Sequence, residues 1–386
     1  MEPLKAGSAL PHYGSTGIMS QPGRPNLETT GFPPAVCAMK AVLGLLVLPA
    51  LVVCLLVLVV LTFGWLTAGP GEIDSLVDRL ARQGPGQWQA AVALAGALAD
   101  PDNAAIKNDR QLAARLALIL GQEIRFGSMQ QGRTTLRAYL CRALGEFYVA
   151  DGLPVLLEAA STHRDDRELE VRRAAIEALA VLAANIGAEQ VAGAKDVLPV
   201  LLAASQDGRA SVRSPAAFTL GVLGGEVANS RLRQMLGDTY PDVRYNAATG
   251  LARRGDIKAV DVLLEMLDPH QQAALEVEKQ QPARRFKRTL ILINGLRAVE
   301  QFAAANRQAV ADRSADLRRL ARAVERLCQA GVEPAVRSTA ADVLEMLKRD
   351  ESVGQDIKRQ ESTGQNTQSV PNGEPVTTAK DAPSSR

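Results

Sequence analysis

The sequence predicts an all-α protein, in which an α-solenoid of stacked antiparallel helix pairs follows one N-terminal transmembrane helix. Three observations favour this class. A charge-free apolar run lies near the N-terminus, an arginine-centred pattern recurs five times beyond it, and aromatic residues make up only 4% of the 386 residues. Abundant alanine and leucine with few aromatic residues favour closely packed helices over a β-sandwich.

Residues 41–67 are the predicted transmembrane helix. No charged residue occurs between Lys40 and Glu72, and a helix needs about 20 apolar residues to cross a bilayer. The apolar part of a cleaved signal peptide spans only about 7–15 residues, and a buried core helix of this length rarely lacks a polar position. Pro49 is tolerated in such a helix, and Trp65 suits the membrane interface.

The charges beside the apolar run predict its orientation. Lys40 adjoins the run on the N-terminal side, whereas Glu72, Asp74 and Asp78 come first on the other side. The positive-inside rule therefore favours a cytoplasmic N-terminus and a repeat domain outside. Met39 is an alternative start site, and it would leave this orientation unchanged.

The two ends of the chain have the composition of disordered tails. Residues 1–38 hold many Pro, Gly, Ser and Thr residues, and residues 350–386 are polar throughout. Neither segment shows the apolar periodicity that a folded element needs.

The repeated pattern places an apolar residue before an arginine, small residues after it, and a leucine seven positions beyond it. Positions −1, +3 and +7 from the arginine lie on one face of a helix, which a neighbouring helix can cover. A helix pair cannot bury that face alone, so the pairs must stack into a solenoid. The arginines of the five copies are Arg137, Arg172, Arg213, Arg244 and Arg337, and the leucines are Leu144, Leu179, Leu220, Leu251 and Leu344.

An aspartate precedes three of these arginines by six residues. Asp166, Asp207 and Asp238 stand at the turn that leads into each helix. An acidic side chain there suits the unpaired N–H groups of a helix N-terminus. Similar apolar segments at 153–157 and 198–202 predict second helices of the pairs.

The motif Asp238-x-x-x-Asp242-Val243-Arg244-x-x-Ala247-Ala248-x-x-Leu251 resembles the HEAT-like repeat family, in the short-repeat form named after phycobilisome lyases. Residues 211–221 carry a second match. The resemblance implies stacked helix pairs in which Asp and Arg link adjacent repeats. It covers residues 132–268 and a lone copy at 336–347, and it indicates fold far better than function.

The flanks of the repeats depart from the pattern. Residues 71–131 have helical patterns without the arginine signature, so we expect a helical cap or degenerate repeats. Two further copies between Arg244 and Arg337 would place arginines at positions that hold Leu275 and Asn306. We therefore expect residues 269–349 to be an irregular helical region with long helices at 286–302 and 316–327, ending in a repeat-like helix.

The sequence predicts no catalytic, cofactor-binding or metal site. It has three histidines and four cysteines, and it lacks Cys-x-x-Cys, His-Glu-x-x-His and a phosphate-binding glycine loop. We interpret the glycines at 221–225, and Gly145 with Glu146, as helix C-caps. We expect a protein that is not an enzyme.

One charge asymmetry suggests a binding site. Residues 146–279 carry 20 acidic and 14 basic residues, whereas residues 284–326 carry 11 basic and 4 acidic ones. The tightest group is the basic cluster, Arg284, Arg285, Lys287 and Arg288, which opens a helix where positive charge opposes the dipole. Three interpretations are open: a solvated helix face, a contact for an acidic protein surface or a second copy of the chain, and a nucleic-acid contact. No aromatic side chains accompany the cluster as a platform for stacking bases, so nucleic acid is not expected.

These observations predict a membrane-tethered HEAT-like scaffold that binds a protein partner and performs no catalysis. The alternative is an enzyme, or an accessory subunit of one such as a lyase-like HEAT protein, acting at the membrane. The sequence leaves the oligomeric state and the partner open.

Overall fold

The computed structural model describes residues 70–82, 84, 86–307 and 310–365, and every regular element in these residues is a helix. The predicted disordered tail at 1–38 and transmembrane helix at 41–67 lie outside the described residues. Among the helices that are described, none combines the length and the apolar character needed to span a bilayer.

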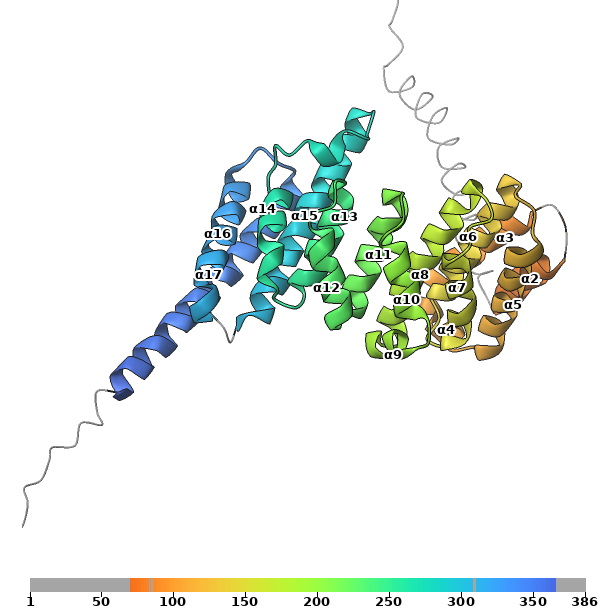
Figure 1. Ribbon diagram of the computed structural model, residues 1–386, viewed down its shortest axis with the longest axis horizontal. Coiled ribbons are helices and arrows are strands. Elements are labelled where there is room, and N and C mark those ends of the chain that lie inside the picture. The colour runs from red at the N-terminus through yellow and green to blue at the C-terminus, as the bar shows by residue number, and fades with distance from the viewer. Residues whose placement is uncertain (1–69, 83, 85, 308–309, 366–386) are drawn as a thin grey trace, which may run out of the picture. The chain divides into compact units, whose positions relative to one another are not determined.

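The described helices form two layers, and the chain alternates between them (Figure 1). In the first layer, each helix packs beside the next one of that layer; the helices are α3 (Gln87–Ala99), α6 (Gln131–Gly145), α8 (Leu169–Ile186), α11 (Ala210–Leu223), α13 (Pro241–Ala252), α15 (Gln281–Ala305) and α17 (Pro334–Gln365). The second layer consists of α5 (Arg110–Phe126), α7 (Leu153–Ala160), α10 (Val197–Ala204), α12 (Glu226–Met235), α14 (Val260–Met266) and α16 (Val310–Gln329).

Shorter elements begin the chain and connect the layers. Helix α2 (Pro70–Ala81) packs against α3 and α5 at the start of the described helices. The expectation of a helical cap or degenerate repeats at 71–131 stays a prediction. The connecting elements are α4 (Ala104–Lys107), α9 (Ala188–Gly193) and five 3₁₀ turns, η1 (Pro101–Asn103), η2 (Ala150–Gly152), η3 (Asp166–Glu168), η4 (Ile257–Ala259) and η5 (Ala273–Leu275). The result is a helical-repeat solenoid, as the sequence predicts.

The apolar face of the repeat pattern forms the core. In α13, Val243, Ala247 and Leu251 are fully buried, because they occupy the side of the helix that meets its neighbours. The pattern leucines of α6, α8 and α11 are fully buried as well. The fifth copy differs: Leu344 of α17 is only partly buried, and Val343 and Leu347 face the core instead.

The arginines of the pattern join successive repeats. Arg172 of α8 lies 2.7 Å from a carboxylate oxygen of Asp207, which precedes α11. Arg213 of α11 lies at the same distance from Asp238, which precedes α13. Both aspartates also accept a hydrogen bond from the backbone N–H two residues later. Each aspartate therefore stabilises the turn before its own helix and, through its ion pair, contacts the preceding repeat.

The first link uses a different acid from the one the sequence suggests. Arg137 of α6 is fully buried and lies 3.3 Å from Glu168, which is also fully buried. Asp166 instead pairs with Arg209 at the surface. Glu168 lies closer to the start of α8 than Asp166 does, and of the two side chains only that of Glu168 reaches the interior. Arg164 and Thr162 also donate hydrogen bonds to its carboxylate there.

Two glycines bring the backbones of α11 and α13 together. A Cβ atom on Gly221 would lie 2.7 Å from the Cα atom of Gly250, so any larger residue would force the helices apart. Gly221 is therefore a helix-contact residue and not a C-cap. Gly145 approaches the backbone of α8 in a similar way, and it is also the last residue of α6, with Glu146 at the C-cap as expected. Helix α11 is ended by Gly224 and Gly225, whose positive φ values of 70° and 85° favour glycine.

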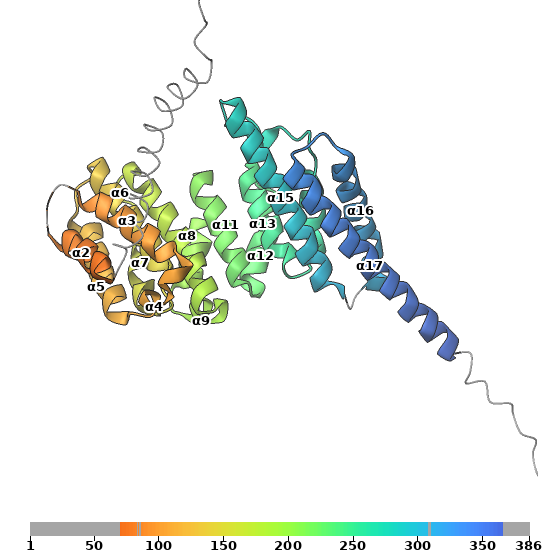
Figure 2. The ribbon, with the colours of Figure 1, turned by 180° about the vertical axis from the view of Figure 1, so that it is seen from behind.

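The region without the arginine pattern continues the stack. Helices α15 and α16 contain the two long helices predicted at 286–302 and 316–327, and they form one pair where the arginine spacing suggests two. Helix α15 packs on α13 and α14, and α17 packs on α15 and α16, as Figure 2 shows from behind. One helix pair covers the stretch of sequence expected to hold two pairs, because α15 has 25 residues and α16 has 20.

Helix α17 also extends further than the sequence suggests. We expect disorder from Asp350, but the helix continues 15 residues beyond it to Gln365. Residues 351–365 contain no proline, and the first one after Asp350 is Pro371. The polar composition removes the apolar face without interrupting the helix.

Candidate functional site

The predicted basic cluster lies in the first turns of α15, where its members have different surroundings. Arg284 is partly buried, and its Nε donates a hydrogen bond of 2.6 Å to the carbonyl oxygen of Glu278. Arg285 is exposed, whereas Lys287 and Arg288 are partly buried.

Acidic residues of the same chain hold part of this cluster. Lys287 Nζ lies 3.0 Å from a carboxylate oxygen of Asp242 on α13. Arg285 lies 3.6 Å from Glu333, a longer and more exposed pair. The buried Arg288 Nε makes no hydrogen bond within the described residues.

The structure therefore does not gather the four charges on one exposed patch. Positive charge at the start of α15 opposes the helix dipole, but Asp242 and Glu278 of the same chain contact the cluster and offset part of that charge. Its role in binding a partner stays a prediction that now rests mainly on Arg285.

A groove on the outer face of the first layer offers a different candidate site. It consists of two adjacent hollows. The first hollow, of about 600 Å³, is formed by α8, α11, the start of α13 and the segment around η5. Phe218, Tyr240 and Val277 line it, and their side chains are exposed although they are apolar or aromatic.

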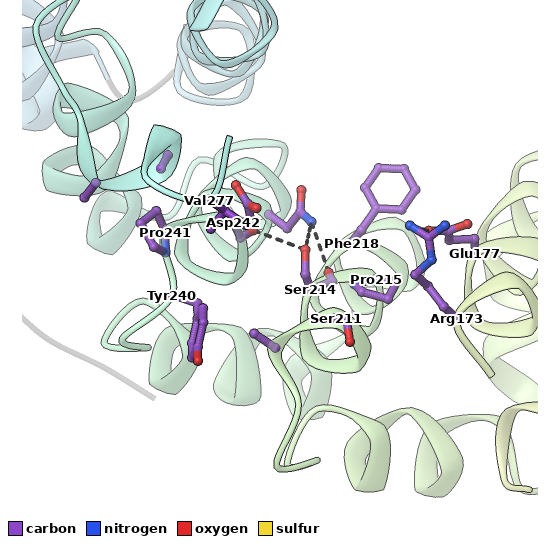
Figure 3. Close-up of a pocket in the computed structure, with 14 residues that line it drawn as sticks. Arg173, Glu177, Ser211, Ser214, Pro215, Phe218, Tyr240, Pro241, Asp242 and Val277 are labelled. Atoms are coloured by element: carbon purple, nitrogen blue, oxygen red, sulfur yellow. Dashed lines mark hydrogen bonds and ion pairs between the residues drawn. The ribbon is translucent and has the colours of Figure 1, made fainter. Parts of the chain in front are cut away.

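Figure 3 shows how the first hollow is arranged. Phe218 stands on α11 between Ser214 on one side and Arg173 with Glu177 of α8 on the other. Tyr240 lies at the opposite end, just before α13. The hollow therefore crosses the α8–α11–α13 layer.

The second hollow, of about 490 Å³, lies between α13 and α15. Its walls are helix stripes with spacings of three and four residues, which place their members on one face of each helix. The α13 stripe consists of Asp242, Tyr245, Asn246, Thr249 and Arg253. The α15 stripe consists of Lys287, Leu290, Ile291, Asn294, Arg297, Ala298 and Gln301.

The two hollows form one groove because Ser214, Phe218, Asp242 and Asn246 line both. At this junction, the Asn246 amide nitrogen donates hydrogen bonds of 3.0 Å to the carbonyl and hydroxyl oxygens of Ser214. These bonds fix α11 against α13 beneath the groove.

A hydrogen-bond network supports the floor of the second hollow. The Tyr245 hydroxyl donates to Glu265 at 3.0 Å, and Arg244 donates to the same carboxylate at 2.5 Å. Burial, followed by the charge of Glu265, raises the pKa of Tyr245 well above its usual value. Burial also raises the pKa of Glu265, but hydrogen bonds from Arg244, Tyr245 and Gln271 outweigh it and hold that pKa below its usual value.

Arg253 has an unusual environment for a charged group. It is partly buried, its guanidinium lies 5.7 Å from the centre of the Phe218 ring, and no carboxylate pairs with it in the described part of the chain. Burial and, secondarily, the neighbouring Arg254 lower the pKa of Arg253. The groove therefore contains a positive charge that no described carboxylate neutralises.

Two chemical features of the described residues bear on metal binding and on nucleophilic chemistry. No three His, Cys, Asp or Glu side chains among them are close enough to hold a metal ion. Burial raises the pKa of the Cys141 thiol to about 12, which makes it a poor nucleophile. His270 is exposed beside the segment that closes the first hollow.

The sequence carries a signal for the groove in the comparison of its own repeats. Phe218 stands five residues after its pattern arginine, where the copies in α6, α8 and α13 have Arg142, Glu177 and Thr249. An aromatic residue at a position that is otherwise polar marks an exposed face with a purpose other than packing.

Comparison with known proteins shows a similarity in the middle of this solenoid. Residues 197–277 match the family model described as HEAT repeats, and this segment runs from α10 through η5. The matched segment supplies most of the residues that line the groove. The closer resemblance to the phycobilisome-lyase type stays a prediction.

Solved structures with similarity to this chain include YibA of Escherichia coli, at 16% identity and a TM-score of 0.32, covering 70% of this chain and 92% of YibA. Human deoxyhypusine hydroxylase in complex with glycerol matches at 20% identity and a TM-score of 0.28, covering 72% of this chain and 96% of the hydroxylase chain. An engineered protein matches at 14% identity and a TM-score of 0.24, covering 72% of this chain and 99% of the engineered chain. No curated protein sequence matches the chain.

Proposed function

We propose that this protein is a membrane-tethered HEAT-repeat scaffold that binds a segment of another protein in the groove and performs no chemistry of its own. The observation that carries the proposal is the groove itself. It exposes Phe218, Tyr240, Val277 and Leu290 on one continuous hollow surface. Exposed apolar groups gathered in a concave surface with a polar rim are typical of binding sites.

The tether is the charge-free segment 41–67, which lies outside the described residues. Its length and composition support a single-pass anchor with the N-terminus inside and the repeats outside. Deleting residues 41–67 should move the protein from the membrane pellet to the soluble fraction after a high-speed spin. Recovery of the undeleted chain in the soluble fraction would contradict the tether.

Site-specific photo-crosslinking tests the groove. A photo-crosslinking amino acid at position 218 or 290 of the full chain should capture the same discrete protein in intact cells. Position 227 is the matched control, since Val227 is also exposed and apolar but lies on α12 in the second layer. Equal capture from position 227, or no capture from either groove position, would refute the proposed binding surface.

A further inference from the structure

The second hollow contains two guanidinium groups without carboxylate partners. Arg253 on α13 and Arg297 on α15 line it together, and neither forms an ion pair with another described residue. Asp242 is the single carboxylate among the residues that line this hollow, and Lys287 pairs with it at 3.0 Å. The hollow therefore has two positive charges left over.

This shortage of acid contrasts with the rest of the fold. The pattern arginines of α6, α8, α11 and α13 each lie within 3.3 Å of a carboxylate. Arg253 is partly buried, as Arg213 and Arg244 are, but its neighbours are Phe218 and Arg254. A partly desolvated charge without a counter-charge is costly, and a bound anion would remove that cost.

The first hollow has a different charge balance. Arg173 pairs with Glu170 at 2.9 Å and lies 3.7 Å from Glu177, so the α8 end of the groove has no unpaired positive charge among its described residues. The apolar side chains of Tyr240 and Val277 lie in this hollow. A ligand that fits the whole groove therefore presents negative charge in the second hollow, between α13 and α15, and apolar groups in the first hollow.

The dimensions and the amides of the groove suit an extended polypeptide. The groove crosses four neighbouring helices, and packed helices are about 8–10 Å apart, so it spans roughly 24–30 Å. An extended chain covers about 3.3 Å per residue, so eight or so residues fill that length. Asn294 and Gln301 are exposed amides on the α15 wall, and each can donate to and accept from a peptide backbone.

From these features we propose that the groove binds an extended acidic segment of a partner protein, with an Asp or Glu carboxylate held between Arg253 and Arg297 and an apolar side chain beside Phe218. This inference rests on the proposed function and specifies the chemistry of the partner. It moves the acidic contact that the sequence suggests from the start of α15 to the middle of that helix.

Selection from a random twelve-residue peptide display library, with the full chain as bait, tests the inference. Selected peptides should be enriched in Asp and Glu, and replacing those residues by Gln or Asn should weaken binding roughly tenfold or more. The double variant Arg253→Gln, Arg297→Gln should lose the preference. The control Arg319→Gln, Arg322→Gln changes net charge equally on α16 and should keep it.

Charge reversal gives the sharpest outcome. The double variant Arg253→Glu, Arg297→Glu should select peptides enriched in Lys and Arg. Binders that depend on Phe218 but show no acidic enrichment would overturn this inference and leave the proposed function intact. A library that yields no binder dependent on Phe218 would overturn both.

Competition for the selected peptides in the same experiment tests two other possible occupants of the groove. A peptide with the sequence of residues 366–386 that displaces the selected peptides at lower concentration would make the chain's own C-terminal segment the occupant and overturn the inference. Displacement by a single-stranded oligonucleotide more effectively than by an acidic peptide would do the same in favour of nucleic acid.

Discussion

Two copies of one sequence pattern have opposite surroundings in this protein. In α6, Arg137 is fully buried and reaches the buried Glu168. In α17 the matching Arg337 is exposed, and among the described residues its guanidinium donates to the carbonyl oxygen of Val332, at 3.3 Å, and to no carboxylate. The difference arises from the neighbours of each helix in the stack. A pattern arginine needs a later segment to supply a carboxylate, and α17 is the last helix described.

The comparison teaches that the repeat pattern specifies a helix face, while the stack decides what that face contacts. Where repeats continue on both sides, the face is sealed and its arginine is neutralised. Where the stack ends, the same residues turn partly to solvent, as Leu344 does. Substitutions at matching positions therefore test the comparison directly.

The largest expected effect is at the buried ion pair. Arg137→Ala should lower the free energy of unfolding by about 3–5 kcal/mol, because it leaves a buried carboxylate with fewer partners. Arg337→Ala should change it by no more than ~0.5 kcal/mol. Thermal melting of the full chain, followed by circular dichroism, measures both; similar shifts would show that the two arginines are equivalent after all.

The pattern leucine should show a similar contrast. Leu220→Ala should cost about 2–5 kcal/mol, because the side chain is fully buried between helix pairs. Leu344→Ala should cost about 1 kcal/mol, in keeping with its partial burial. Arg209→Ala is a surface control expected within ~0.5 kcal/mol. A loss at Leu344 as large as that at Leu220 would contradict the shifted register of α17.

The aspartates between repeats should make stability depend on acid. The hydrogen bonds from Arg213 hold the pKa of Asp238 below its usual value. Its contribution is therefore complete above the unfolded pKa, about 3.9, and is lost as the pH falls through the lower folded pKa. Asp238→Asn should cost about 1–2 kcal/mol at pH 7, and less as the pH falls below ~4.

The acid dependence has a simple check. Melting midpoints of the wild type and of Asp238→Asn, measured from pH 7 to pH 3, should converge at the acid end. A constant gap between the two curves would mean that the ion pair is not the source of the difference.

The smallest effects should come from the basic cluster. Lys287→Ala should lower stability by roughly 0.5–1 kcal/mol through loss of the pair with Asp242, and Arg285→Ala by less than ~0.5 kcal/mol because its pair is long and exposed. Urea unfolding of both variants decides the order. A larger loss from Arg285→Ala would restore the cluster as one functional patch.

Much of the repeat architecture could be predicted from the sequence. The periodic positions predicted the buried face of α13 correctly, and the family resemblance implied the Asp–Arg links of α8 and α11. Glu168 was missed because a carboxylate two residues beyond Asp166 is indistinguishable in the pattern until the turn η3 places it inside. The groove was missed because its walls come from α13 and α15, and periodicity within one helix cannot show which helix lies beside it.

The contact between Gly221 and Gly250 also has a mechanical consequence for the groove. Gly221 and Gly250 bring the backbones of α11 and α13 into contact, so no side-chain rotation can narrow the distance between these two helices at that point. Between α13 and α15, by contrast, the spacing depends on side chains, such as Met266 lining the second hollow. The α11–α13 part of the groove thus has a fixed width, whereas the width of the α13–α15 part can adjust. A bound segment would therefore be held mainly by adjustment of the α13–α15 part.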